Sequence, residues 1–134
     1  MTLQECYAAL GGSYDEVMGR LRSERLVQKF VLKFLNDGSY QLLRDSLAAG
    51  DRDEAFRAAH TIKGVCANLA FDRLLESSEQ LTEALRDGKP PEPGEEKLLA
   101  RVEADYECTR QAIQAFQEGV GGRRTRQHGF WRSA

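Results

Sequence analysis

The sequence predicts an all-α protein, an up-and-down antiparallel four-helix bundle with short additional N-terminal helices. Three observations carry this prediction. Apolar residues recur three and four positions apart along most of the chain, and no alternating apolar and polar run is long enough for a strand. Long amphipathic segments joined by short connections favour antiparallel neighbours. The three prolines gather in GKPPEPG at 88–94, which predicts one loop between helical regions.

Three helices are expected in the first part of the chain. The first covers about 3–10 and ends at the two glycines that follow, and the second covers about 14–21. Ser23 can cap a third helix, which ends at NDG in 36–38. Its apolar residues recur on one side: Leu26, Val27, Phe30, Val31, Phe34 and Leu35.

Three further helices are expected before the proline loop. One carries several leucines and ends at Gly50. Asp51, with Glu54 three positions later, resembles an acidic capping box and opens the next helix. Asp72 can cap the third, which Gly88 closes.

Beyond the loop, apolar residues repeat over a helix of roughly 24 residues, about 36 Å long. Its stripe from Leu99 to Phe116 is expected to be core, with a dimerisation seam as the alternative. We place the helical domain at 1–118 and a basic, disordered tail at 119–134, which holds four arginines and no acid. The tail is expected to be solvated, and contact with an anionic partner or membrane surface is the alternative.

The composition is that of one soluble domain and indicates neither a nucleic-acid partner nor a membrane segment. The net charge is −2, and without the four tail arginines 15 basic residues face 21 acidic ones. No apolar run approaches the roughly 20 residues of a membrane span, and the N-terminus lacks a secretory signal. The three cysteines are far apart, which is typical of free thiols in a reducing compartment. We therefore expect a cytoplasmic monomer.

The stretch AAHTIKGVCANLAF at 58–71 places a histidine on the outer side of a helix. A helix turns about 100° per residue, so each side chain has a direction relative to Ala55. His60 falls at about 140° and Gly64 at about 180°, away from the core. Small and apolar residues lie within roughly 80° of Ala55 and form the predicted core face: Ala58, Ala59, Ile62, Val65, Cys66 and Leu69.

The residues around this histidine suggest that another molecule approaches it. A glycine inside a helix needs a reason, because it costs about 1 kcal/mol relative to alanine. Gly64 and Ala67 leave little side chain beside the imidazole, which lets a partner come close. Lys63 places a positive charge within one turn, and Arg57 can add to it. An exposed imidazole is mostly neutral at pH 7 and available as a nucleophile. These features together suggest a phosphoryl acceptor.

The residues HTIKG at 60–64 resemble the HxxKG motif of histidine-containing phosphotransfer (HPt) domains, the relay modules of bacterial multi-step phosphorelays. The likeness extends from about residue 2 to 118 and includes the preceding FxxAAH and the following NL. Two positions depart from the family pattern. Ala70 stands where many members have glycine, and Cys66 where many have serine or another small residue. Both residues are small, so they bear on partner preference rather than on the histidine.

The resemblance implies a four-helix bundle whose active histidine is exposed midway along one helix. His60 would be the phosphoacceptor through Nε2, Lys63 would help to neutralise the phosphoryl group, and Gly64 would give clearance for docking. The partners would be the receiver domain of a response regulator and a histidine kinase or hybrid kinase. The receiver would supply the aspartate and its Mg²⁺, so the chain itself needs no cofactor or metal. The docking surface would come from Phe56, Arg57, Lys63, Gly64 and Ala67.

The sequence has no glycine-rich nucleotide loop, no kinase-type ATP lid and no acidic metal cluster near His60. We therefore expect a phosphoryl carrier between receiver aspartates rather than an enzyme with its own ATP site. The alternatives are a helical interaction scaffold and a degenerate HPt module that has lost phosphotransfer. A hydrolase or metalloenzyme is weaker, because no acidic residue orients His60 and His128, the second histidine, lies in the tail.

Overall fold

The computed structural model describes the backbone of residues 1–125 and the side chains of residues 1–120, and all regular elements in this range are helices. In chain order they are α1 (Leu3–Leu10), α2 (Tyr14–Leu21), α3 (Glu24–Lys33), the 3₁₀ helix η1 (Phe34–Asn36), α4 (Ser39–Ala49), α5 (Arg52–Leu69), α6 (Asp72–Leu85), the 3₁₀ helix η2 (Arg86–Gly88) and α7 (Glu95–Thr125). The all-α prediction is confirmed.

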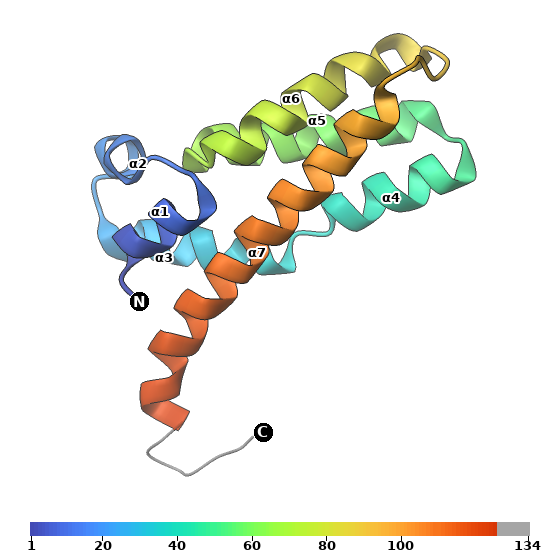
Figure 1. Ribbon diagram of the computed structural model, residues 1–134. Coiled ribbons are helices and arrows are strands. Elements are labelled where there is room, and N and C mark those ends of the chain that lie inside the picture. The colour runs from blue at the N-terminus through green and yellow to red at the C-terminus, as the bar shows by residue number, and fades with distance from the viewer. Residues whose placement is uncertain (126–134) are drawn as a thin grey trace.

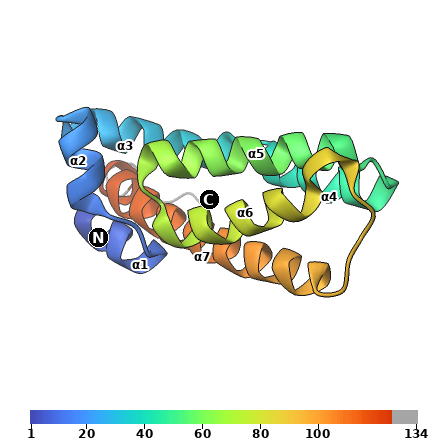
Figure 2. The same cartoon turned by 90° about the horizontal axis from the view of Figure 1, so that it is seen from above.

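Helices α4 to α7 form the bundle. Each packs against the next in the chain, and the direction alternates from one helix to the next, as the up-and-down prediction requires (Figure 1). Helix α3 continues the line of α4 after the short η1 and reaches both α5 and α7. Viewed from above, α1 and α2 close one end of the bundle, with α1 against α7 (Figure 2). The short N-terminal helices are therefore part of the packed body.

Side-chain caps fix where several helices begin. Ser13, Ser23 and Asp51 each accept a hydrogen bond at 3.1 Å from the backbone N–H three residues later, at the starts of α2, α3 and α5. These bonds satisfy N–H groups that a helix start otherwise leaves unpaired. The expected cap at Asp72 is wrong by one residue. Phe71 occupies the N-cap position without a side-chain bond, and Asp72 is the first helical residue.

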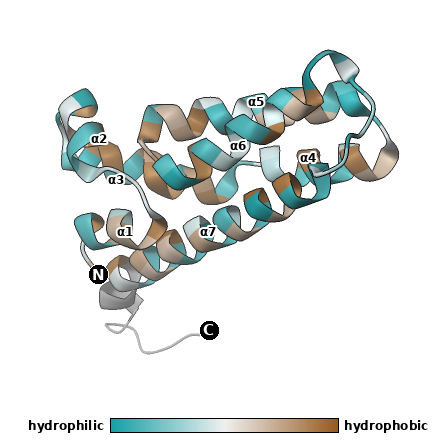
Figure 3. Ribbon diagram, turned by 45° about the horizontal axis from the view of Figure 1, so that its top comes forward, coloured by the Kyte–Doolittle hydropathy of each residue, from teal (hydrophilic) through white to brown (hydrophobic). Residues whose placement is uncertain are grey.

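The core confirms the direction assigned to α5. Ala55, Ala59 and Cys66 are at most 1% exposed, whereas His60 is on the exposed side. The hydropathy colouring shows the same separation of faces along the helices (Figure 3). The prediction for α3 holds only in part: Val27 and Val31 are buried, but Leu26 and Phe30 are 36% and 37% exposed. One side of the apolar stripe of α3 therefore faces solvent.

The last helix is longer than the roughly 24 residues expected. Helix α7 has 31 residues and ends at Thr125, so it continues past the boundary at 118. The remaining part of the expected tail, 126–134, lies outside the described residues. Leu99 is half-buried, while Val102, Ile113 and Phe116 are buried, so this stripe is core. Within the described residues, no helix combines the length and the apolar character that crossing a membrane requires.

Candidate functional site

The histidine lies in the middle of α5, on the side that the bundle leaves uncovered. His60 is exposed and Lys63, three residues later, is half-buried. Apart from its two chain neighbours and the backbone of α5 itself, a Cβ atom added at Gly64 would meet no atom within 4 Å, so this glycine is not required by internal packing. Because neither packing nor an unusual backbone explains it, the open space beside His60 is the feature that Gly64 provides. Ala67, one turn further on, is half-buried.

The imidazole of His60 also has an aromatic neighbour, Phe56, one turn earlier on α5. The rings of Phe56 and His60 lie nearly parallel, with their centroids 6.0 Å apart and an interplanar angle of 17°. The guanidinium carbon of Arg86, in η2, lies 5.3 Å from the centroid of the Phe56 ring. Arg86 also pairs with Glu83 at 2.6 Å, and this bond lowers the pKa of the Glu83 carboxyl. The sequence pattern suggested Phe56 but not Arg86.

Arg57 is committed to its own helix. Its guanidinium pairs with Glu54 at 2.6 Å, and that hydrogen bond raises the pKa of Arg57. The backbone carbonyl of Arg57 accepts a hydrogen bond from the Thr61 hydroxyl at 2.9 Å. The charge of Arg57 is therefore already compensated by Glu54. Lys63, which is also three residues from His60, forms no salt bridge within the described residues.

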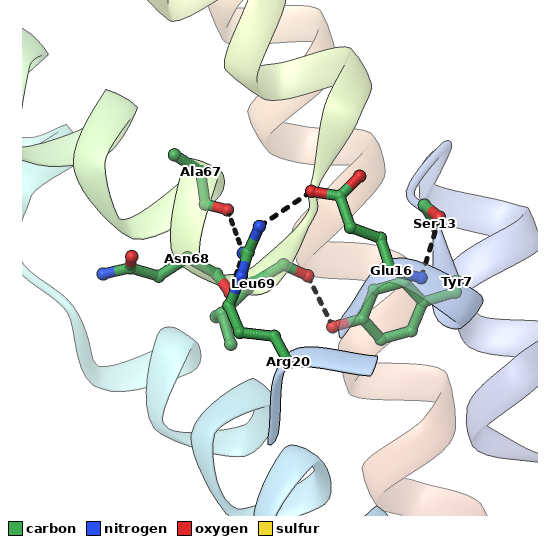
Figure 4. A network of polar contacts seen from close by, with 7 residues as sticks. All are labelled: Tyr7, Ser13, Glu16, Arg20, Ala67, Asn68 and Leu69. Atoms are coloured by element: carbon green, nitrogen blue, oxygen red, sulfur yellow. Dashed lines mark hydrogen bonds and ion pairs between the residues drawn. The ribbon is translucent and has the colours of Figure 1, made fainter. Parts of the chain in front are cut away.

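The C-terminal end of α5 is held by the N-terminal helices (Figure 4). Arg20 donates to the carbonyls of Ala67 and Asn68 at 2.6 and 2.7 Å, and the hydroxyl of Tyr7 donates to the carbonyl of Leu69 at 2.8 Å. Carbonyls in the last turn of a helix lack partners within the helix, and a cation there also suits the helix dipole. Ala70 ends the helix with φ at 58°, a left-handed conformation that favours glycine.

A groove opens beside this end of α5, next to the histidine face. It has a volume of about 390 Å³ and lies between α5 and the N-terminal helices. Val65 and Asn68 line it from α5, and Phe30 and Lys33 line it from α3. Asn68 lies one turn after Gly64 on the same side of α5, so the groove adjoins the histidine face of the helix. This groove was not predicted, because Phe30 was assigned to the core.

The cysteines do not contribute a reactive group to this face. Cys6 and Cys66 are fully buried, and burial raises their thiol pKa values to about 11 and about 12. Cys108 is half-buried on α7, with its sulfur 3.5 Å from the carbonyl oxygen of Ala9. Among the described residues, no three His, Cys, Asp or Glu side chains lie close enough together to hold a metal ion.

Comparison with known families gives a class for this bundle and its exposed histidine. The family model of the Hpt domain matches residues 35–119, well over half of the chain and including all of α5. The chain therefore belongs to the Hpt domain family, as the motif at 60–64 predicts. Members of this family are phosphocarrier modules that work with kinases and receiver domains in phosphorelays. No curated protein and no solved structure gives a significant match to the chain.

Proposed function

We propose that this protein carries a phosphoryl group on His60 and passes it between receiver-domain aspartates in a phosphorelay. The observation that carries the proposal is the bare surface around His60, where Gly64 leaves open space in the middle of an Hpt-family helix. A phosphate-bearing partner needs such access, because the attacking nitrogen must come within bonding distance of phosphorus in line with the leaving oxygen.

The chemistry follows from the groups on this face. Nε2 of His60 attacks the phosphorus of a receiver phosphoaspartate. The N–P bond forms as the acyl-phosphate P–O bond breaks, and its electron pair leaves with the aspartate as a carboxylate. Transfer to the next receiver is the reverse step. Lys63 lies one turn from the ring on the same helix and offsets the charge of the transferred group. The partner receiver would hold the Mg²⁺, and the chain acts as a carrier without a nucleotide site of its own.

The docking surface that we propose extends beyond the predicted residues. Phe56, Gly64 and Ala67 remain in it, and Arg57 lies at its edge, paired with Glu54. The groove adds Phe30 and Lys33 from α3. Exposed apolar side chains beside a cation suit a receiver domain with an apolar helix and an acidic phosphorylation site. We propose that the protein is a cytoplasmic monomer and that one copy binds one receiver domain.

The test of the central claim is transfer of radiolabelled phosphate from a panel of phosphorylated receivers and kinase–receiver hybrids. The wild type is expected to take up an acid-labile, base-stable label, and His60→Gln is expected to take up none. Since His60 is exposed, this variant should fold like the wild type. Label that persists in His60→Gln would place the acceptor elsewhere. A wild type that no donor labels, including the small-molecule donor phosphoramidate, would favour the scaffold and degenerate-module alternatives.

The docking surface has a separate test. Phe30→Ser removes an exposed apolar side chain from the groove, and Leu42→Ser removes one of similar exposure from α4. We expect Phe30→Ser to slow transfer from a receiver about tenfold while its labelling by phosphoramidate stays at the wild-type rate. Leu42→Ser should leave both rates unchanged. Equal receiver-dependent rates for the two variants would remove the groove from the docking surface.

A further inference from the structure

The imidazole of His60 is exposed, yet one side of it has a neighbour. The Phe56 ring, one turn earlier on α5, lies nearly parallel to it with a centroid separation of 6.0 Å. Residues at positions i and i+4 share one face of a helix, so the two rings are adjacent without any bend in the backbone. Phe56 is half-buried, so its own ring is more restricted than that of His60. The ring of Phe56 therefore limits the directions in which the imidazole can turn.

Phe56 is in turn covered from a different element. Arg86 lies in η2, at the end of α6, and its guanidinium is 5.3 Å from the centre of the Phe56 ring. Two nitrogens of this guanidinium, Nε and Nη2, donate to the carboxylate of Glu83, with Nη2 at 2.6 Å from Oε2. A planar guanidinium held at two points stacks on a ring in one orientation, which an ammonium group cannot do.

We propose that Arg86, oriented by Glu83, is a positioning residue for the phosphoacceptor: it keeps Phe56 against His60 and so holds the imidazole in a single direction. This inference rests on the proposed phosphotransfer function. The charge of Arg86 is matched by Glu83, so its contribution is geometric rather than a second neutralising charge. Glu83 also feels the positive charges of Lys63 and Lys89, which keep its carboxyl ionised and lower its pKa further. The ion pair between Glu83 and Arg86 is therefore present at neutral pH.

Orientation of this ring matters for rate. An unrestrained histidine on a helix surface samples more than one staggered rotamer, and only some of these aim Nε2 at an incoming phosphorus. Restricting the ring before the partner arrives removes that search from the barrier to transfer. Phosphoramidate is the informative donor here, because it needs no protein docking. Nε2 attacks its phosphorus, the N–P bond to histidine forms, and the P–N bond to ammonia breaks.

The experiment compares four variants in two measurements. One is the rate of labelling of His60 by phosphoramidate, and the other is the NMR shift of the carbon-bound imidazole protons, which the nearby Phe56 ring displaces. Phe56→Leu removes the ring, Arg86→Gln the guanidinium, and Glu83→Gln its anchor. Arg110→Gln is the matched control, since it breaks a similar Arg–Glu pair three residues apart on α7.

We expect Phe56→Leu to lose the ring-induced shift and to label about two- to tenfold more slowly. Arg86→Gln and Glu83→Gln should shift the His60 protons in the same direction and slow labelling by a smaller factor, while Arg110→Gln changes neither measurement. Arg86→Gln with wild-type shifts and a wild-type rate would overturn the proposal. Faster labelling in Glu83→Gln would also overturn it, because Arg86 would then act by neutralising the phosphoryl charge and not by positioning the ring of His60.

The two measurements separate this proposal from the function on which it rests. The proton shifts report the geometry of His60 in the unphosphorylated protein, so they support or contradict the positioning even if no donor labels the wild type. Wild-type protein that is labelled at His60, together with Arg86→Gln that is labelled equally fast and shows the same shifts, would keep the function and reject the positioning.

Discussion

The middle and the C-terminal end of α5 belong to one continuous helix but differ in their contacts. The rest of the molecule leaves one side of the middle open, whereas it forms hydrogen bonds to the end. In the middle, His60 is exposed and the space beside Gly64 is empty. At the end, side chains from two N-terminal helices bond to three successive carbonyls. The comparison teaches that one part of α5 gives a partner access to His60, while another part receives the hydrogen bonds that hold the helix in place. A partner can reach the histidine because the support of its helix lies elsewhere.

Filling the open middle should have the largest effect. Gly64→Gln introduces a side chain into the space beside His60, and nothing in the fold resists it. We expect receiver-dependent transfer to fall about a hundredfold, because the partner is displaced from the geometry that transfer requires. The thermal unfolding midpoint should not fall.

Gly64→Ala is the control for that variant. A methyl group occupies little of the docking space and improves helix propensity, so the free energy of unfolding should rise by about 0.5–1 kcal/mol. Transfer should stay close to the wild-type rate. A Gly64→Gln protein with wild-type transfer would show that the open space is not used by the partner.

Removing one hydrogen bond from the C-terminal end of α5 should lower the stability of the fold without changing phosphotransfer. Tyr7→Phe deletes a buried hydroxyl and leaves the carbonyl of Leu69 without this donor at 2.8 Å. We expect the free energy of unfolding to fall by about 1–2 kcal/mol in urea or thermal denaturation. Labelling by phosphoramidate, measured well below the unfolding midpoint, should be unchanged. A large loss of labelling would contradict the separation of the two regions.

The exposed bonds at the same end should matter less. Arg20→Met keeps most of the aliphatic side chain but removes the donors to the carbonyls of Ala67 and Asn68, together with the exposed ion pair to Glu16 at 2.9 Å. Water can replace those donors, so we expect a loss of about 0.5–1 kcal/mol in chemical denaturation. A loss equal to that of Tyr7→Phe would mean that solvent does not reach these carbonyls.

The smallest expected effect concerns the reactivity of the three cysteine thiols, two of which are buried. At about pH 8 the reactive thiolate form is scarce for Cys6 and Cys66, because burial raises their pKa values to about 11 and about 12. Mass spectrometry after brief alkylation should therefore find label on Cys108 first, and on the other two only after unfolding. Early modification of Cys66 would show that α5 opens in the native state.

Much of this arrangement follows from local patterns in the sequence. Helical angles alone separate the buried side of α5 from His60, and a small side chain at position 64 is readable as clearance. Caps by Ser23 and Asp51 are predictable because they involve only neighbours in the chain. These interactions depend on residues a few positions apart.

The features that were not predicted join distant parts of the chain. Arg86 reaches the ring of Phe56 only because α6 returns alongside α5, and no periodicity encodes that contact. Phe30 fits the apolar period of α3 but is exposed, because it lines the open groove beside α5 and is not covered by a neighbouring helix. Likewise, the pairing of Arg57 with Glu54 competes with any role near His60, and the pattern alone does not choose between the two.

The support for α5 also bears on which part of the chain can be moved as a unit. The family match begins at residue 35, but Tyr7 and Arg20, which hold the end of the histidine helix, come before it. A fragment cut to 35–119 would keep the motif and lose its anchor. Fusing this Hpt domain to another protein therefore calls for the first 34 residues as well, since the folded unit is larger than the segment that matches the family.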